Sequence, residues 1–309
     1  MRSAPHLWLA LAAAACSIAL VTAAAFPVLA AISGRAPELI EVEGAVTTAV
    51  GPGMIRYQRT SDSGNIMLLL HGYNNQLAVW NPSWPQLRRC GQAIRIDVPG
   101  YGGSNWPTAS FALPDQADRI IAFLDAQHIS QVTVIGGSMG GSLAAWIAAK
   151  YPERVRSLML MAPSGYPGAL TYGGRFRFLY RRGLANTLAT RVAASGLYRR
   201  LYPTSRALQA LTVTASYGGS WAAALPAIQA PTLVVWSRGD PAVPFEYADS
   251  VTRAIPGAVL LPLSADVGHA LNERRAELIG LLACQLNRGA SPTEAVEAVR
   301  PLLVSQGDR

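Results

Sequence analysis

Short apolar runs alternate with amphipathic stretches along most of this chain. Runs that are too short for helices and are bounded by turn residues predict strands buried on both faces of a sheet. These runs lie at residues 65–70, 93–98, 132–136, 155–161, 233–236 and 259–263. Helical spacing of apolar residues occurs between them, at 115–127, 142–150, 245–254 and 272–285. The alternation predicts an α/β fold, a doubly wound and mostly parallel sheet with helices on both faces.

Three other segments complete this pattern. Residues 39–43 and 54–60 predict two edge strands that pair as a hairpin, and residues 289–309 predict a short terminal helix with a frayed tail.

Residues 165–226 interrupt the alternation with an irregular helical pattern that contains many aromatic and arginine residues and no acidic residue. An insertion of this size after a strand predicts a helical cap over the strand ends. Its arginines either contact membrane phosphates or an anionic substrate, or form a solvated outer face.

The N-terminus is uncharged from residue 7 to residue 32. About 20 apolar residues span a bilayer, whereas the apolar core of a signal peptide has roughly 7 to 15. We therefore expect residues 1–34 to form a membrane anchor, with a cleaved signal peptide as the alternative. A short leader with few charges favours export of the globular part, which would be anchored to the membrane or, after cleavage, periplasmic or secreted. The globular core is then expected at 35–164 and 227–309, on either side of the cap.

Composition narrows the class of protein further. Half of the residues are apolar, which predicts a large core and argues against disorder. The formal charge of +8 comes almost entirely from arginine, since Lys150 is the only lysine. Such a charge permits contact with anionic surfaces without requiring it, and we expect no nucleic-acid partner. Cys16, Cys90 and Cys284 show no paired spacing, which argues against a zinc site or a disulfide scaffold. Free buried thiols are the expected state, and a single bridge between Cys90 and Cys284 is the open alternative.

A glycine-rich turn joins the apolar run at 132–136 to the helical pattern that follows it. The turn reads Gly-x-Ser-x-Gly, with Ser138 between Gly136 and Gly140. Glycines two residues before and after the serine let the strand, turn and helix pack closely. The helix N-terminus also favours negative charge beside the serine oxygen. This arrangement predicts a nucleophile, whereas a glycine-rich turn with an incidental serine is the simpler alternative.

A serine nucleophile needs a histidine base that is oriented by a carboxylate. His269 follows the last predicted strand, at the same sheet edge as Ser138, and Asp240 follows the strand at 233–236. The chain order serine, acid, histidine is the order expected for this architecture. Asp266 is the alternative acid, but it lies three residues from His269 on one loop and is poorly placed to reach the ring.

The segment after the strand at 65–70 predicts the second half of the site. His71 and Gly72 form a turn there that can direct the main-chain N–H of Tyr73 toward the serine. With the N–H of Met139 it would form an oxyanion hole. We expect His71 to stabilise its own loop and His128 to lie at the surface or to cap a helix. This chemistry requires no metal and no organic cofactor.

Five motifs at predicted strand ends together resemble the α/β-hydrolase superfamily over residues 54–287. They are His-Gly-Tyr-Asn, Asp-Val-Pro-Gly-Tyr-Gly-Gly-Ser, Gly-Gly-Ser-Met-Gly-Gly, Gly-Asp-Pro-Ala-Val-Pro and Gly-His. The resemblance is closest to the capped esterases, lipases and carbon–carbon hydrolases, because the dehalogenase and epoxide hydrolase branches carry aspartate where this chain has Ser138. It implies a structural role for the loop at 97–104. Asn74, where many relatives carry glycine or proline, and the arginine-rich cap depart from the family pattern.

The resemblance implies a serine hydrolase that cleaves a carboxylic ester through an acyl-enzyme on Ser138. A membrane segment at 7–32 and an aromatic cap favour an apolar, lipid-like ester as the small-molecule substrate. The same three residues also serve carbon–carbon bond hydrolases, acyltransferases and perhydrolases, so these remain alternatives. A protein of this fold that binds without catalysis is the alternative from another class.

Overall fold

The computed structural model describes residues 38–60, 63–106, 112–165 and 220–307. The expected leader over 7–32 lies outside the described residues, as does most of the expected cap over 165–226. Within the described ranges, no helix combines the length and apolar character needed to cross a membrane. The domain boundaries and the membrane segment stay predictions.

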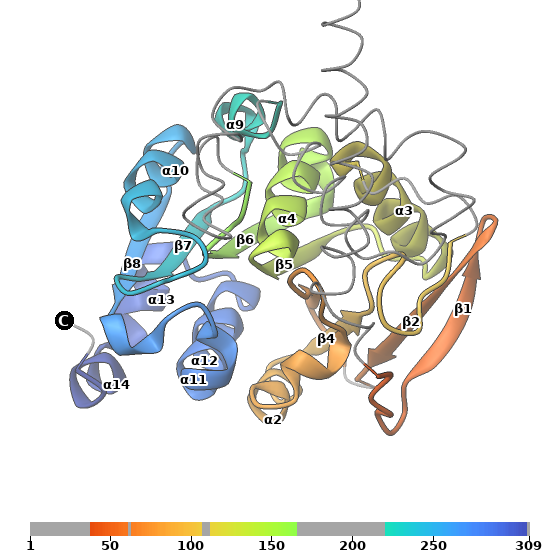
Figure 1. Ribbon diagram of the computed structural model, residues 1–309, viewed down its shortest axis with the longest axis horizontal. Helices are drawn as coiled ribbons and strands as arrows, with labels where there is room; N and C mark the ends of the chain where they lie inside the picture. Colours follow the sequence, from red (N-terminus) through yellow and green to blue (C-terminus); the bar gives the residue numbers. More distant parts are fainter. Residues whose placement is uncertain (1–37, 61–62, 107–111, 166–219, 308–309) are drawn as a thin grey trace, which may run out of the picture.

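One eight-stranded sheet runs through the described part of the chain (Figure 1). From one edge to the other, the strands are β1 (Val46–Val50), β2 (Gly53–Arg59), β4 (Gln92–Ile96), β3 (Ile66–Leu70), β5 (Val132–Gly137), β6 (Val155–Met161), β7 (Thr232–Ser237) and β8 (Val259–Leu263). The β1–β2 and β2–β4 pairs are antiparallel, and all the other pairs are parallel. The predicted α/β fold with a mostly parallel sheet is confirmed.

Helices cover both faces of this sheet. Figure 1 shows α3 (Leu113–Ala126), α4 (Met139–Lys150) and α10 (Ala248–Ala254) on one face, and α12 (Ala276–Asn287) with α2 (Trp84–Leu87) on the other. The shorter helices are η1 (Leu77–Trp80), η2 (Pro152–Arg154), α9 (Ser220–Ala224), η3 (Leu225–Ala227), η4 (Phe245–Tyr247), η5 (Ala265–Val267), α11 (Leu271–Arg274), α13 (Pro292–Ala298) and α14 (Arg300–Ser305). Because both faces are covered, the central strands are almost wholly apolar, and residues 67–70 of β3 are fully buried.

The N-terminal edge of the sheet differs from the prediction. Residues 39–43 form no strand, and β2 pairs with β1 at 46–50 instead. Gly44, at φ +74°, lies in a turn that separates the two segments. The N–H of Ile40 donates to the side-chain Oε1 of Gln76 at 2.9 Å and makes no strand ladder. Segment 39–43 is therefore held by the side chains of Gln76, Arg56 and Gln58 and not by a strand ladder. Leu39 and Ile40 are exposed.

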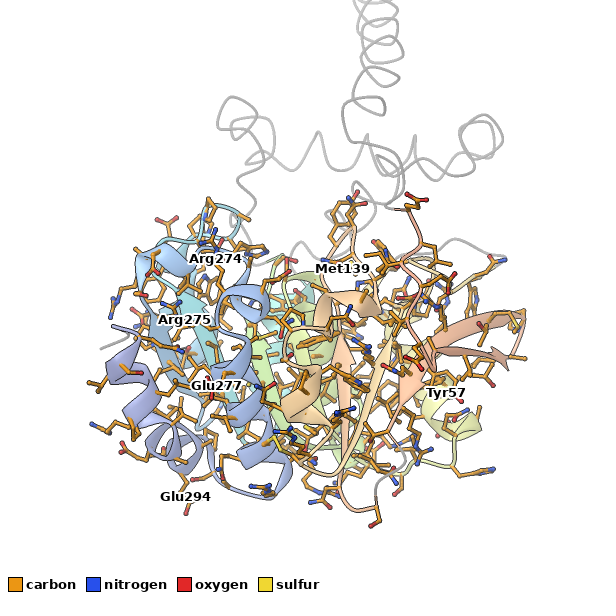
Figure 2. The ribbon with its side chains drawn as sticks, turned by 90° about the horizontal axis from the view of Figure 1, so that it is seen from below. Tyr57, Met139, Arg274, Arg275, Glu277 and Glu294 are labelled. Carbon is orange, nitrogen blue, oxygen red and sulfur yellow. A yellow bond between two sulfur atoms is a disulfide. The ribbon has the colours of Figure 1, made fainter. Side chains whose placement is uncertain are left out.

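The C-terminal helices are also shorter than predicted. The expected helix at 272–285 divides at Arg275, whose φ of −132° and ψ of 41° are not helical. The expected single helix after residue 289 is two helices, α13 and α14. A capping box starts α13, in which the Ser291 N–H donates to the Glu294 carboxylate at 2.7 Å (Figure 2). A new helix begins at Arg300 because Pro301 suits only the first turn of a helix.

Cys90 and Cys284 form a disulfide, so the expectation of free thiols at these positions was wrong. The bond joins the segment after α2 to α12, and the two Cα atoms are 5.3 Å apart. The cysteines are 194 residues apart in the sequence, and local spacing therefore carries no information about their pairing. A native disulfide of this kind typically stabilises a protein by about 2–5 kcal/mol.

Candidate active site

Ser138 lies in the tight turn between β5 and α4. Its backbone has φ +53° and ψ −117°, a conformation that is strained for a residue with a Cβ atom. The turn is held by the Ser138 N–H, which donates to Met161 O at 2.8 Å, and by Ser138 O, which accepts from the N–H of Ser142 at 3.1 Å. The sequence therefore forms the predicted strand–turn–helix unit, with the serine at the carboxyl end of a central strand.

Gly136 and Gly140 permit this turn because there is no room for a side chain at either position. A Cβ atom at Gly136 would overlap the carbonyl oxygen of Gly140. A Cβ atom at Gly140 would overlap the carbonyl oxygens of Leu70 and His71 at the end of β3. The two glycines therefore bring the start of α4 into contact with its own strand and with the neighbouring one.

Asp240 and His269 are hydrogen-bonded across two loops at the same sheet edge. Nδ1 of His269 donates to Oδ2 of Asp240 at 2.7 Å. The Asp240 side chain is fully buried, whereas that of His269 is 28% exposed. The other Asp240 oxygen accepts from the N–H groups of Ala242 and Val243 at 2.8 and 2.9 Å. These bonds fix the carboxylate and direct the second ring nitrogen of His269 away from it.

Asp266 lies outside this arrangement. It is exposed, and its carboxylate contacts Ser264 Oγ at 2.5 Å and the Arg275 guanidinium at 3.3 Å. The hydrogen bond from Ser264 and the charge of Arg275 lower the pKa of this carboxyl group. The structure thus places Asp240, and not the alternative acid Asp266, against the imidazole.

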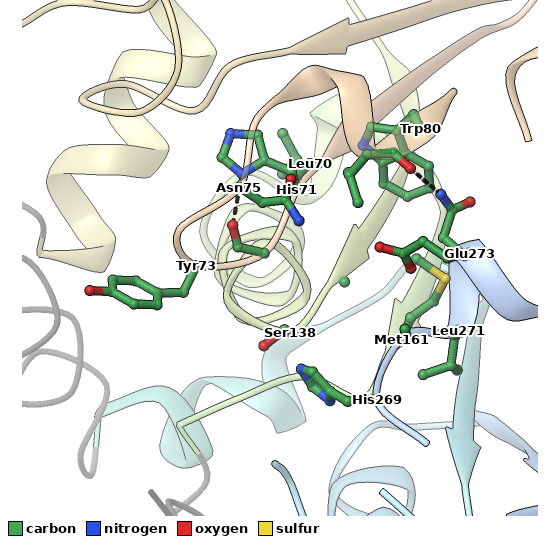
Figure 3. A pocket seen from close by; sticks show the side chains of 15 residues that line it. Leu70, His71, Tyr73, Asn75, Trp80, Ser138, Met161, His269, Leu271 and Glu273 are labelled. Carbon is green, nitrogen blue, oxygen red and sulfur yellow. Dashed lines mark hydrogen bonds between the residues drawn. The ribbon is translucent and has the colours of Figure 1, made fainter. Parts of the chain in front are cut away.

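A cavity of about 220 Å³ lies beside Ser138 and His269 (Figure 3). Its apolar wall is formed by side chains from β3, η1, β6 and α11: Leu70, Val79, Trp80, Met161 and Leu271. Tyr73 also lines it, and a Cβ atom at Gly72 would be 3.3 Å from Cβ of Ser138. Met139 is the first residue of α4, where backbone N–H groups have no partner within the helix. The residues predicted for the oxyanion hole therefore flank Ser138.

The loop after β3 explains the unusual Asn74. This residue has φ +59°, in the left-handed region that glycine enters freely and asparagine tolerates better than most other residues. Asparagine is thus compatible with the positive φ of this position.

His71 is buried and holds this loop in place. Its Nε2 accepts from the N–H of Val98 at 2.9 Å, and its Nδ1 donates to Gly72 O at 2.8 Å. Burial lowers the pKa of His71 below its ordinary value of 6.5. A neutral imidazole with both nitrogens occupied has no free base, which confirms the expected structural role. His128 is exposed just after α3, as predicted.

Asp97 organises the neighbouring loop. Its buried carboxylate accepts from the N–H groups of Leu77 at 2.5 Å and Gly103 at 2.7 Å and pairs with Arg56 at 3.3 Å. All of these partners are structural, as expected for the loop at 97–104. Glu273 and Asn75, in contrast, line the cavity without having been predicted. The motifs identify only residues that take part in the expected mechanism, and the one sequence signal for Glu273 was its position four residues after His269.

The described residues contain no group of three or more histidine, cysteine, aspartate or glutamate side chains that could hold a metal ion. Asp240 and His269 are hydrogen-bonded at the cavity that Ser138 also lines, an arrangement that suits nucleophilic catalysis.

Comparison with known proteins places this geometry in a family. The α/β hydrolase fold profile matches residues 65–195. The chain is 30% identical over 256 residues to the poly(3-hydroxyalkanoate) depolymerase of Ectopseudomonas oleovorans, across 76% of this chain and 86% of the depolymerase. This chain belongs to the α/β hydrolase family.

Other proteins that are similar to this chain have different named activities. The chain is 30% identical to the dihydrolipoyllysine-residue acetyltransferase component of the acetoin cleaving system of Cupriavidus necator, over 72% of this chain and 63% of that protein. It thus spans less than two thirds of that relative. The solved meta-cleavage product hydrolase of Pseudomonas fluorescens is 21% identical, with a TM-score of 0.62 over 78% of this chain and 96% of that one. This last similarity is one of fold.

Proposed function

We propose that this α/β hydrolase is a serine hydrolase that cleaves carboxylic esters through an acyl-enzyme on Ser138. The observation that carries the proposal is the 2.7 Å bond between Asp240 and His269, which lies at the cavity that Ser138 also lines. A buried carboxylate that accepts from Nδ1 keeps the proton on that nitrogen. Nε2 is then left as a base toward the cavity.

In the proposed cycle, Ser138 Oγ attacks the ester carbonyl carbon while His269 Nε2 takes the hydroxyl proton. The N–H groups of Tyr73 and Met139 stabilise the oxyanion, and Asp240 stabilises the imidazolium. When the tetrahedral intermediate collapses, its ester C–O bond breaks and His269 returns the proton to the leaving alcohol. Water, deprotonated by His269, then cleaves the acyl-enzyme and releases the acid and the free serine.

The apolar cavity wall supports an apolar ester as substrate. Five aliphatic or aromatic side chains surround the space beside Ser138, and burying a carbon chain against them is favourable. The similar depolymerase is, by its name, an enzyme that breaks down a poly(3-hydroxyalkanoate), which agrees with ester chemistry on this scaffold.

An exported location is part of the same proposal. The disulfide between Cys90 and Cys284 supports it, because such bonds persist in oxidising compartments and are rare in the cytosol. The uncharged leader at 7–32, either as a membrane anchor or as a cleaved signal, would supply the route.

One labelling experiment tests both parts of the proposal. A fluorophosphonate probe is expected to modify Ser138 of the purified wild-type chain, as read by peptide mass spectrometry. The Ser138→Ala variant should stay unlabelled, while the exposed control Ser130→Ala should label like wild type. A folded wild-type chain that is not labelled would favour a binding protein without catalysis. In cells with an intact cytoplasmic membrane, a membrane-impermeant probe should label Ser138, and labelling only after lysis would overturn export.

A further inference from the structure

Glu273 is the carboxylate that the proposed mechanism does not use among the described residues lining the cavity beside Ser138. Glu273 belongs to α11, which begins directly after the loop of His269, and it lines the same cavity. Figure 3 shows its carboxylate turned toward the cavity, and Glu273 is exposed to solvent there. A charged group at this position faces any substrate group that enters.

Among the described residues that line the cavity, no lysine or arginine compensates the charge of Glu273. The buried His71 is neutral. In the described part of the chain, Glu273 forms neither a hydrogen bond nor an ion pair. The two arginines that follow it are directed elsewhere: Arg274 donates to Asp266 O and Arg275 pairs with the Asp266 carboxylate (Figure 2).

We propose that Glu273 selects substrates by charge, so that the substrate group filling this cavity is neutral or cationic and an anionic group is disfavoured. The inference rests on the proposed ester hydrolysis, for which it defines the substrate class. Esters of dicarboxylic acids, whose second carboxylate would enter beside Glu273, are then poor substrates. Neutral esters, or esters with an ammonium group, are accepted.

The physical basis is short-range repulsion between two like charges, one of them on an exposed residue that lines the cavity. At separations of about 4 Å, Coulomb repulsion between unit charges exceeds thermal energy even in the dielectric of water. The net charge of +8 attracts anions to the molecule as a whole. Discrimination at the cavity therefore has to come from a local group, and Glu273 is the carboxylate among the described residues that line it.

The test compares kcat/KM of matched ester pairs in the wild-type and Glu273→Gln chains. One pair, 4-nitrophenyl butyrate and mono-4-nitrophenyl succinate, places a negative charge on the acyl side. The other, 3,3-dimethylbutyl butyrate and butyrylcholine, places a positive charge on the alcohol side. If the acyl side of the ester enters the cavity, Glu273→Gln should raise the anionic-to-neutral ratio of kcat/KM by roughly threefold to tenfold. If the alcohol side enters it, the substitution should lower the cationic-to-neutral ratio of kcat/KM by a similar factor. Salt should weaken the wild-type discrimination.

Glu277→Gln is the matched control, because it makes the same charge change at an exposed position of α12 outside the cavity. Its ratios should equal those of wild type. Ratios within twofold of wild type in both arms for Glu273→Gln would overturn the inference, even if neutral esters are hydrolysed. A shift of equal size in Glu277→Gln would also overturn it, because the effect would then come from net charge.

A binding measurement keeps the inference testable if no ester is hydrolysed. Ligand-observed NMR would measure binding of hexanoate and hexanamide to the Ser138→Ala chain with and without Glu273→Gln. The added substitution should strengthen binding of hexanoate relative to hexanamide by a similar factor. An unchanged ratio would refute charge selection by Glu273, whereas absence of ester turnover would refute the proposed function alone.

Discussion

Asp240→Asn is expected to lower kcat for a neutral ester by roughly 10³-fold to 10⁴-fold, the size of effect known from other serine–histidine–aspartate triads. The amide carries no charge to stabilise the imidazolium. Its NH₂ group can also face Nδ1 of His269, which favours the tautomer that has the proton on Nε2 and no base toward Ser138. Steady-state kinetics with 4-nitrophenyl butyrate measures the loss.

Asp266→Asn is the matched control for this change. Asp266 is exposed and bonds to Ser264 and Arg275, so its variant should keep kcat within about twofold of wild type. In Asp240→Asn the remaining oxygen can still accept from Ala242 and Val243, and thermal unfolding should therefore show a folded protein. The assignment of Asp240 would fail if its folded variant kept a tenth of wild-type kcat, or if Asp266→Asn were the inactive variant.

Gly140→Ala is expected to cost about 3 kcal/mol or more of unfolding free energy, or to prevent folding. The new methyl group would overlap the carbonyl oxygens of Leu70 and His71, which belong to the backbone and lie at the end of a central strand. Neither α4 nor β3 can move without disturbing the packed core. Urea unfolding followed by circular dichroism gives the difference, and soluble yield serves if the variant does not fold.

Gly137→Ala is the control in the same turn. A Cβ atom there would be 3.4 Å from Cε of Met161, the flexible end of a side chain. Its φ is not in the left-handed region, and the expected cost is below about 1 kcal/mol. Equal stability of the Gly137→Ala and Gly140→Ala chains would show that the close approach of α4 to β3 does not constrain the turn.

The central sheet could be predicted because the local sequence of each central strand is enough to indicate a buried strand. The run at 155–161 is apolar except for Arg156 and Ser157, since both faces of the strand are covered, and the observed β6 has these same bounds. The edge of the sheet was harder to predict. The sequence at 39–43 resembles a strand, but the N–H of Ile40 donates a hydrogen bond to the Gln76 side chain and not to a neighbouring strand. Arg275 similarly interrupts a pattern that is apolar with helical spacing on both sides.

The sequence by itself determined the α/β class, the strand–turn–helix unit around Ser138 and the few candidates for the catalytic acid and base. These features depend on neighbours along the chain. Only the tertiary structure decided which groups meet. In it, Asp240 is hydrogen-bonded to His269, two cysteines separated by 194 residues form a disulfide, and Glu273 lines the cavity. Such contacts depend on how separate loops converge at the carboxyl edge of the sheet, and packing of the whole domain sets that convergence.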